Sequence, residues 1–158
     1  MPGITAILHT HNDALRIARA IESLRCCEEV LIIDHNSTDD TCRIARAFGA
    51  RTIAAAGDRG ANFHWAGEAA NDWIFCMHPA EAVPEMLEAS LLEWKLEEHP
   101  TQKAFAVALL EEIPEGWVTH PPEPRLAHRS HSRWDKWKPV AEAEIRVLDG
   151  PLTRLNLP

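Results

Sequence analysis

Short apolar runs alternate with amphipathic segments along most of the chain. The runs have the length and composition of buried strands and cover residues 4–9, 30–33, 51–54, 73–77 and 104–110. Between several of them, apolar residues recur at spacings of three and four, which predicts helices over residues 14–25 and 84–98 and another that ends at Gly49.

This alternation predicts an α/β fold in a single domain. The expected architecture is a doubly wound, mainly parallel sheet with helices on both faces and right-handed crossovers. Residues 1–110 would form the α/β core. Residues 111–158 are expected to be irregular because they contain several prolines, among them Pro114, Pro121, Pro122, Pro124 and Pro139.

Polar side chains follow the predicted strands at their carboxyl ends. In open parallel sheets the ligand crevice lies beyond these ends. This rule predicts that six residues lie together along the carboxyl ends of the strands, which we call the rim: Thr10, Asn12, Asp34, His35, His78 and Glu81. Neither G-x-G-x-x-G nor G-x-x-x-x-G-K-[ST] occurs, so the chain lacks the phosphate-binding glycines of dinucleotide-binding and P-loop proteins.

Composition narrows the class of protein. The 158 residues carry a formal net charge of -8, which argues against nucleic acid as a partner because phosphate contacts need clustered cations. The four cysteines form neither a disulfide framework nor a zinc spacing, and are expected to be reduced thiols. With no leader sequence and no 18-residue apolar run, a cytoplasmic protein that does not itself span the membrane is expected.

Two motifs resemble a known enzyme family. Residues 4–13 (ITAILHTHND) and 30–41 (VLIIDHNSTDDT) are similar to the opening of family 2 glycosyltransferases of the GT-A fold, with T-x-N-E after the first strand and V-D-D-G-S-T-D-x-T after the second. Weaker similarities follow at Asn62-Phe63, residues 72–74, 124–126 and 148–152. The chain most resembles bacterial members that build lipopolysaccharide cores and related envelope glycans.

The resemblance implies a nucleotide-sugar site. Thr10, Asn12 and Asp34 would contact the uracil and ribose of a nucleotide-diphosphate sugar, with a UDP-sugar as the first choice of donor. A hexose would pass to a cell-envelope glycan or lipid-linked acceptor at the inner face of the membrane, with residues 111–158 on the acceptor side. In the alternative interpretation, Asn12 and Asp34 are only turn and cap residues.

The chain departs from the family where a metal is held. At the positions of the family's Asp-Ala-Asp-Glu motif stand His78, Pro79, Ala80 and Glu81. One imidazole and one carboxylate are a poor ligand set for Mg²⁺ or Mn²⁺, so no metal cofactor is assigned. A mixed site of Asp34, His78 and Glu81 for Mn²⁺ or Zn²⁺ is the alternative. Where many relatives have V-H-E, this chain has Val140-Ala141-Glu142, and we expect a truncated member of the family.

Two functions fit these departures. In the first, the protein is a transferase in which Arg125, Arg129 or Arg133 stabilises the diphosphate in place of a metal. In the second, it is a degenerate module that binds nucleotide sugars, or another protein, without chemistry. A general base is available among Glu111, Glu112 and Glu123, but no motif selects one.

The remaining charged groups leave further alternatives open. The basic stretch from Arg125 to Lys138, with Trp134 and Trp137, would meet a diphosphate, an anionic glycan or a membrane surface, or would be a solvated loop. A second copy of the chain would be able to supply a missing acceptor-side element. Six acidic residues are expected on the exposed face of one helix: Glu81, Glu85, Glu88, Glu93, Glu97 and Glu98.

Overall fold

The computed structural model describes residues 1–55, 64–97, 100, 102–131, 133–135, 137–140 and 145–156. Asn62-Phe63 and Ala141-Glu142 lie outside the described residues. The helices are α1 (Ile17–Glu22), α2 (Thr41–Ala47), α3 (Glu85–Lys95) and the 3-10 helix η1 (Trp65–Glu68). The strands are β1 (Ile4–Thr10), β2 (Glu29–Asp34), β3 (Arg51–Ala54), β4 (Trp73–Cys76), β5 (Glu81–Ala82), β6 (Ala104–Ile113), β7 (Gly116–His128), β8 (Trp134–Asp135), β9 (Lys138–Pro139), β10 (Arg146–Val147) and β11 (Leu152–Arg154).

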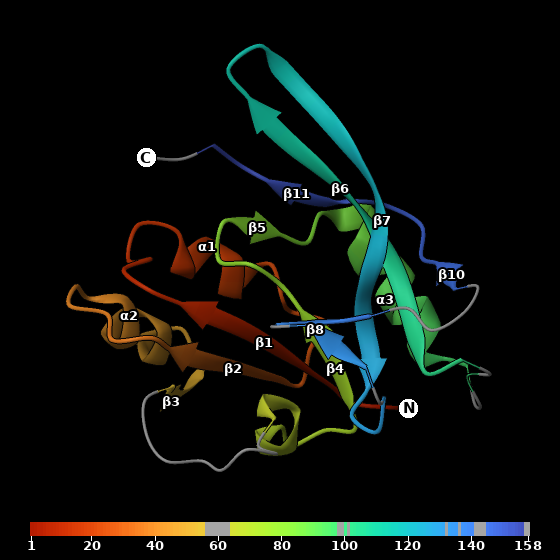
Figure 1. Ribbon diagram of the computed structural model, residues 1–158, viewed down its shortest axis with the longest axis horizontal. Helices are drawn as coiled ribbons and strands as arrows, with labels where there is room; N and C mark the ends of the chain where they lie inside the picture. Colours follow the sequence, from red (N-terminus) through yellow and green to blue (C-terminus); the bar gives the residue numbers. More distant parts are fainter. Residues whose placement is uncertain are drawn as a thin grey trace.

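One large sheet runs through the molecule in the order β3-β2-β1-β4-β7-β6-β11-β5, with β10 beside β6 (Figure 1). The strands β3, β2, β1 and β4 are parallel to one another, whereas β7 is antiparallel to both of its neighbours, β4 and β6. Thr10 pairs with Asp34 across β1 and β2, and Ile7 pairs with Cys76 across β1 and β4. The predicted α/β class with a mainly parallel sheet is therefore confirmed, and the carboxyl ends of β1, β2 and β4 meet at one rim.

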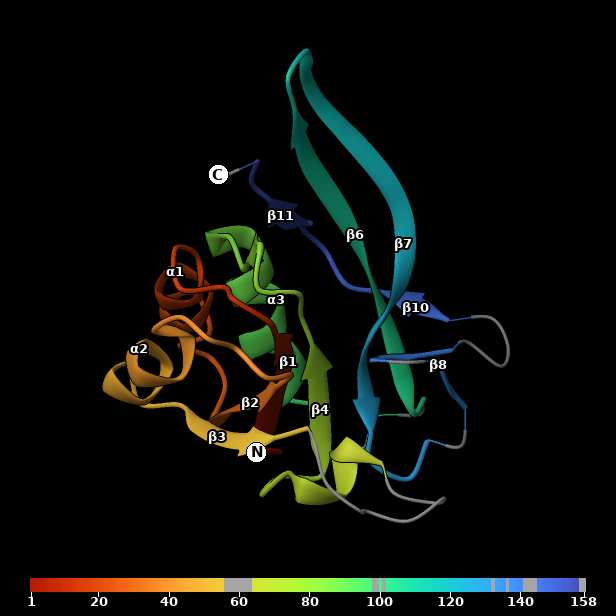
Figure 2. The ribbon, with the colours of Figure 1, turned by 60° about the vertical axis from the view of Figure 1, so that its left-hand side comes forward.

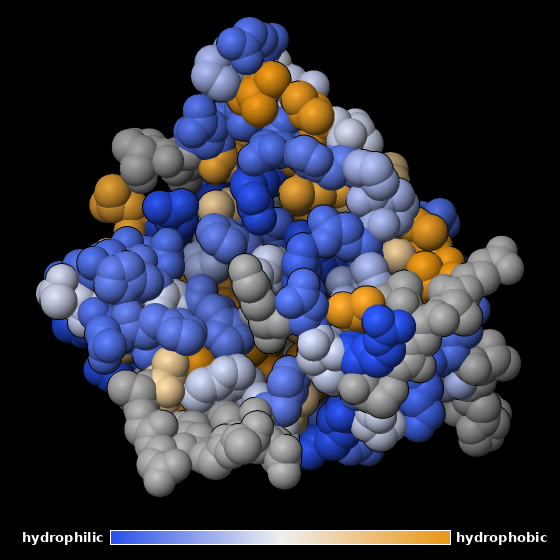
Figure 3. Space-filling view, viewed as in Figure 1, coloured by the Kyte–Doolittle hydropathy of each residue, from blue (hydrophilic) through white to orange (hydrophobic). Residues whose placement is uncertain are grey.

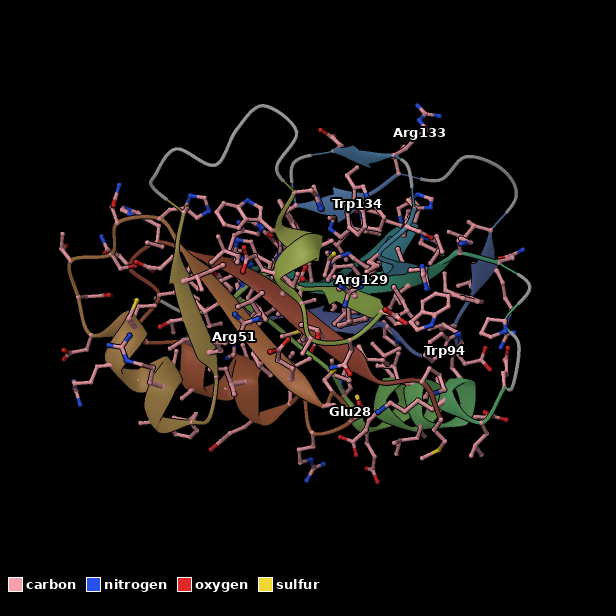
Figure 4. The ribbon with its side chains drawn as sticks, turned by 90° about the horizontal axis from the view of Figure 1, so that it is seen from below. Glu28, Arg51, Trp94, Arg129, Arg133 and Trp134 are labelled. Carbon is pink, nitrogen blue, oxygen red and sulfur yellow. The ribbon has the colours of Figure 1, made fainter. Side chains whose placement is uncertain are left out.

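The helices cover the two faces of this sheet unequally. Leu8, Ile32 and Phe75 belong to the main core with the inner residues of α1, α2 and α3, so all three α-helices lie on one face (Figure 4). The other face is covered by η1 and by Trp134 and Trp137. Chain direction explains this difference. From β1 to β3 each new strand is added on the same side of the one before it. β4 lies on the other side of β1, so the connection from β3 to β4 crosses the opposite face, where η1 is the one helix among the described residues.

The helices occur where the sequence predicts them, but they are shorter. Residues 17–22 and 85–95 are α-helical, against predicted ranges of 14–25 and 84–98. Gly49 follows α2 with a φ of 91°, the left-handed conformation of a helix-terminating glycine, as predicted. Within the described residues, no helix is both long and apolar enough to cross a membrane.

The last third of the chain is more regular than expected. β7 covers residues 116–128, lies between β4 and β6, and forms a long hairpin with β6 that projects from the body (Figure 1, Figure 2). The pairing passes from Val107–Glu123 to Leu109–His120, so Pro121 and Pro122 fall in an irregular part of the ladder. Proline is tolerated in strands at such bulges because no ladder hydrogen bond is lost there. The expected boundary at residue 110 instead falls inside β6.

Candidate functional site

The ends of β1 and β2 hold an oriented carboxylate at the rim. Oδ1 of Asp34 accepts hydrogen bonds from Thr10 Oγ1 at 2.7 Å and Ser37 Oγ at 2.6 Å, and Oδ2 accepts from the Ser37 backbone N–H at 3.0 Å. Burial raises the pKa of Asp34, but the hydrogen bonds from Ser37 and Thr10 outweigh it, so the pKa lies below its usual value. Asp34 is thus an ionised, half-buried acceptor.

Asn12 joins the turn after β1 to the loop after β2. Its φ is 52°, and its Oδ1 accepts from the backbone N–H of Thr38 at 2.8 Å, while its own N–H donates to Ser37 Oγ at 2.9 Å. These contacts fit the interpretation of Asn12 as a turn residue. They also hold the Asp34 loop in place, so the structure brings Thr10, Asn12 and Asp34 together, as the rim prediction requires.

Histidines line the same rim on the side of η1. His9 Nδ1 and His35 Nε2 share a hydrogen bond of 2.9 Å, and His11 Nδ1 donates to the His35 carbonyl at 2.6 Å. Burial, followed by the neighbouring His35, lowers the pKa of His9 to about 4. His9 is therefore neutral near pH 7 and adds no positive charge for a ligand.

Glu81 lies at the other end of the rim, in β5 and not on a helix. Its side chain is 0% exposed, so the expectation that it belongs to an exposed helix face is wrong. Nη1 and Nη2 of Arg125 donate to its two oxygens at 2.7 and 3.0 Å, and Nη2 of Arg154 donates at 2.9 Å. Burial raises the pKa of Glu81, but these arginines, Arg125 first, bring it below its usual value. Glu81 is a buried counter-ion.

A bulge in β7 aims Arg125 at Glu81. Phe105 pairs with Leu126 and Ala106 with Pro124, so Arg125 has no partner residue on β6. Such bulges turn one side chain out of the regular alternation. The Arg125 side chain is 2% exposed, donates to the carbonyl of Cys76 at 3.2 Å, and lies 5.0 Å from the centroid of the Trp137 ring.

The residues at the metal position do not fit a divalent cation. Besides the arginines, Oε1 of Glu81 accepts from the His78 backbone N–H at 2.8 Å, so both of its oxygens are fully engaged. Nδ1 of His78 accepts from the Ala80 N–H at 3.0 Å, which leaves that ring one nitrogen. No three His, Cys, Asp or Glu side chains among the described residues are grouped to hold a metal. The mixed Asp34, His78 and Glu81 site is not formed.

The three arginines predicted for the diphosphate do not lie together in one site. Only Arg125 is at the rim. Arg129 forms an ion pair with Asp72 at 3.3 Å and donates to the carbonyl of Ala69. Both partners lie at the amino end of β4, whereas the rim is at the carboxyl ends of the strands. Arg133 is exposed and points away from the sheet (Figure 4). Arg129 and Arg133 are therefore left out of the candidate site.

Two other arginines, which sequence reasoning did not select, take their place. Arg154 is the last residue of β11 and lies opposite Glu81 of the neighbouring strand β5. Arg16 directly precedes α1 and forms an ion pair with Asp13 at 3.1 Å. Arg154 and Arg16 both lower the pKa of His78, after burial, which places their charges near that ring. Local sequence patterns do not predict that β11 pairs with the distant strands β5 and β6, so no sequence signal pointed to Arg154. The left-hand side of the molecule in Figure 3 is largely hydrophilic, although Leu15, next to Arg16 in the sequence, is exposed.

Comparison with known proteins supports the fold and leads toward a function. No protein-family model matches the chain. It is 37% identical over 91 residues to a protein of Rickettsia felis named uncharacterized glycosyltransferase, and 34% identical over 91 residues to one of Rickettsia prowazekii. These matches cover 56% of this chain, which spans about a third of the length of those relatives: 32% and 31%.

Solved structures give the fold. Glucosyl-3-phosphoglycerate synthase from Mycobacterium tuberculosis, in complex with Mn²⁺, UDP and glucosyl-3-phosphoglycerate, superposes with a TM-score of 0.51 at 20% identity, over 70% of this chain and 44% of the other. A second mycobacterial protein gives 0.56 at 18% identity, over 71% and 42%. The fold is of the GT-A type. At these identities the likeness concerns the fold alone, in which the rim with Asp34 and Glu81 lies at the carboxyl ends of the strands.

Proposed function

We propose that the rim binds a nucleotide-diphosphate sugar and that the chain is the donor-binding part of a glycosyltransferase. The observation that carries this proposal is the Asp34 carboxylate, oriented by Thr10 and Ser37 at the carboxyl ends of β1 and β2. An ionised carboxylate accepts hydrogen bonds from a base N–H or a ribose hydroxyl and disfavours groups that cannot donate. The relatives named glycosyltransferases support the same assignment.

The transfer that we propose is a displacement at the sugar. The bond between the anomeric carbon and the diphosphate oxygen breaks, the acceptor hydroxyl oxygen bonds to that carbon, and the hydroxyl proton passes to a base. The electron pair leaves with the nucleoside diphosphate. The resemblance of the sequence to enzymes of envelope glycan synthesis favours a glycan or lipid-linked acceptor, and a hexose as the sugar.

One of the three candidate bases stands apart from the others. Glu111 bonds to His120 at 2.8 Å and Glu123 forms an ion pair with Lys138, so both carboxylates already have partners. Glu112 has no hydrogen bond or ion pair with the described residues and lies near Arg19, whose Nη2 donates to the Ala80 carbonyl beside His78. We therefore assign the base to Glu112.

Calorimetric titration tests the binding site. UDP, UDP-glucose and uridine are titrated into the wild type, Asp34→Ala and the control Asp40→Ala, which removes an exposed carboxylate of the same loop. We expect all three ligands to bind the wild type and Asp40→Ala, and binding to Asp34→Ala to fall at least about tenfold, since a hydrogen bond to a charged group is lost. Equal affinities in all three proteins, or no binding at millimolar ligand, would overturn the proposal.

A binding module without chemistry is the second candidate. The observation that favours it is Glu81, the one carboxylate at the metal position, which is buried and fully bonded. The two candidates differ in turnover. Release of UDP from UDP-glucose with an added glycan or lipid-linked acceptor, lost in Glu112→Gln while UDP affinity is kept, supports the transferase. Tight binding without release, over a panel of acceptors, supports the module.

A further inference from the structure

The side chains that bond to Glu81 are positively charged, in a protein whose net charge is -8. Arg154, Arg16, Glu81 and Asp13 all act on the His78 ring, and Arg125 shares Glu81 with Arg154. At Glu81 the guanidinium groups of Arg125 and Arg154 thus stand against a single carboxylate, beyond the end of β4, where a relative with a metal motif would place a cation. The excess positive charge at this point suits an anion.

Arg154 keeps hydrogen-bond donors to spare. Nη2 donates to Glu81, and Nε is buried without a partner, while the side chain as a whole is 30% exposed. Because a guanidinium carries five N–H donors, one bond to Glu81 leaves donors on the exposed part of Arg154. Arg125 differs, since its side chain is 2% exposed and both of its Nη groups are bonded to Glu81.

We propose that Arg154, positioned by Glu81, binds the diphosphate of the nucleotide in place of a divalent cation. This assignment rests on the proposed nucleotide-sugar function and specifies how the charged end of that ligand is held. It replaces the three arginines expected from the sequence with one that the fold brings to Glu81 from the last strand, β11.

The chemistry of the guanidinium group supports this role. It stays protonated at any relevant pH, and its planar fork matches two phosphate oxygens at once. Glu81 fixes the position of Arg154 without neutralising the cluster, because the same carboxylate is shared with Arg125.

The experiment titrates uridine, UDP and inorganic pyrophosphate into the protein in the presence of EDTA. The variants are Arg154→Gln, Arg154→Lys and the control Arg146→Gln, which removes an arginine of β10 that is paired with Glu97. Melting temperatures are measured for all of them. We expect UDP and pyrophosphate to bind without metal, and Arg154→Gln to weaken both by tenfold or more while uridine affinity stays unchanged, in line with the loss of a charge-assisted hydrogen bond. Arg154→Lys should recover part of the affinity, and Arg146→Gln should match the wild type.

The outcomes separate this inference from the proposed function. Binding of UDP that requires Mn²⁺, or an Arg154→Gln variant that binds UDP and pyrophosphate as the wild type does, overturns the inference and leaves nucleotide binding standing. Binding of pyrophosphate that depends on Arg154, without any binding of uridine or UDP, supports the anion site and contradicts the nucleotide function. No binding of any of the three probes overturns both.

Discussion

The two ends of the rim each hold a carboxylate, but different donors surround it. Asp34 is half-buried and is oriented by hydroxyl and amide groups of Thr10 and Ser37, which are neutral. Glu81 is fully buried and is bonded by two guanidinium groups, from Arg125 and Arg154. Neutral donors orient a charge without cancelling it, whereas cations cancel it.

We infer that this difference separates a carboxylate that is available to a ligand from one that serves the fold. Asp34 keeps its negative charge near solvent, where a ligand donor can meet it. The charge of Glu81 is used inside the protein to place arginines. Two acidic residues at the same rim of the sheet thus have different environments, and the predictions below change one end at a time.

Removal of Glu81 has the largest expected effect. Glu81→Ala leaves Arg125 buried without a counter-ion, and breaking a buried pair in this way costs about 3–5 kcal/mol of the free energy of unfolding. Equilibrium urea unfolding measures the loss. The control Glu93→Ala, on the exposed face of α3, should change stability by about 0.5 kcal/mol or less. A Glu81→Ala protein as stable as the control would contradict the role of Glu81 as a buried counter-ion.

At the other end, Asp34→Asn should reduce ligand binding more than stability. The amide keeps the size of the carboxylate and one acceptor oxygen, but it removes the negative charge that the ligand meets. We expect UDP affinity to fall by about tenfold or more, and the free energy of unfolding by about 1–2 kcal/mol. Calorimetry and urea unfolding of the same sample check both. A loss of stability as large as that of Glu81→Ala, with UDP affinity kept, would reverse the assignment of the two ends.

The dependence of stability on pH distinguishes the two carboxylates further. Burial raises the pKa of Glu81, but Arg125, the His78 N–H and Arg154 together outweigh burial, and the pKa of Glu81 in the folded protein lies below 4.5. Burial also raises the pKa of Asp34, but the hydrogen bonds from Ser37 and Thr10 bring it below 3.8. A lowered pKa stabilises the folded state fully above the unfolded value, and this contribution is lost as the pH falls through the folded value.

Urea unfolding at a series of pH values measures these contributions. The wild type should lose stability as the pH falls below 4.5, and Glu81→Gln should lose less over this range because it has no carboxyl to protonate. Asp34→Asn should follow the wild type down to about 3.8 and lose less stability only below that value. Identical slopes for the wild type and Glu81→Gln would show that the pKa of Glu81 is not lowered.

The sequence predicted one end of the rim better than the other, for a physical reason. Thr10 and Asp34 are the last residues of two neighbouring parallel strands, and Asn12 lies in the turn after the first. Local patterns of strand and turn were therefore enough to predict that the three lie together. The environment of Glu81 depends on a bulge in β7 and on β11, which pairs with β5 from 73 residues away. The prolines in β7 suggested a loop, and nothing local indicated that Arg154 would reach Glu81.

The smallest expected effect comes from one hydroxyl at the Asp34 end. Ser37 Oγ donates to Asp34 at 2.6 Å and accepts from the Asn12 N–H at 2.9 Å, so it links the two turns of the rim. Ser37→Ala should cost about 1 kcal/mol of unfolding free energy and weaken UDP binding a few-fold, because Thr10 and the Ser37 backbone N–H still orient the carboxylate. The variant also removes a donor that lowers the pKa of Asp34, so the pH at which UDP affinity is half lost should rise. An unchanged pH profile would mean that the hydroxyl holds only the turn, and that Thr10 with the backbone is sufficient to keep Asp34 ionised.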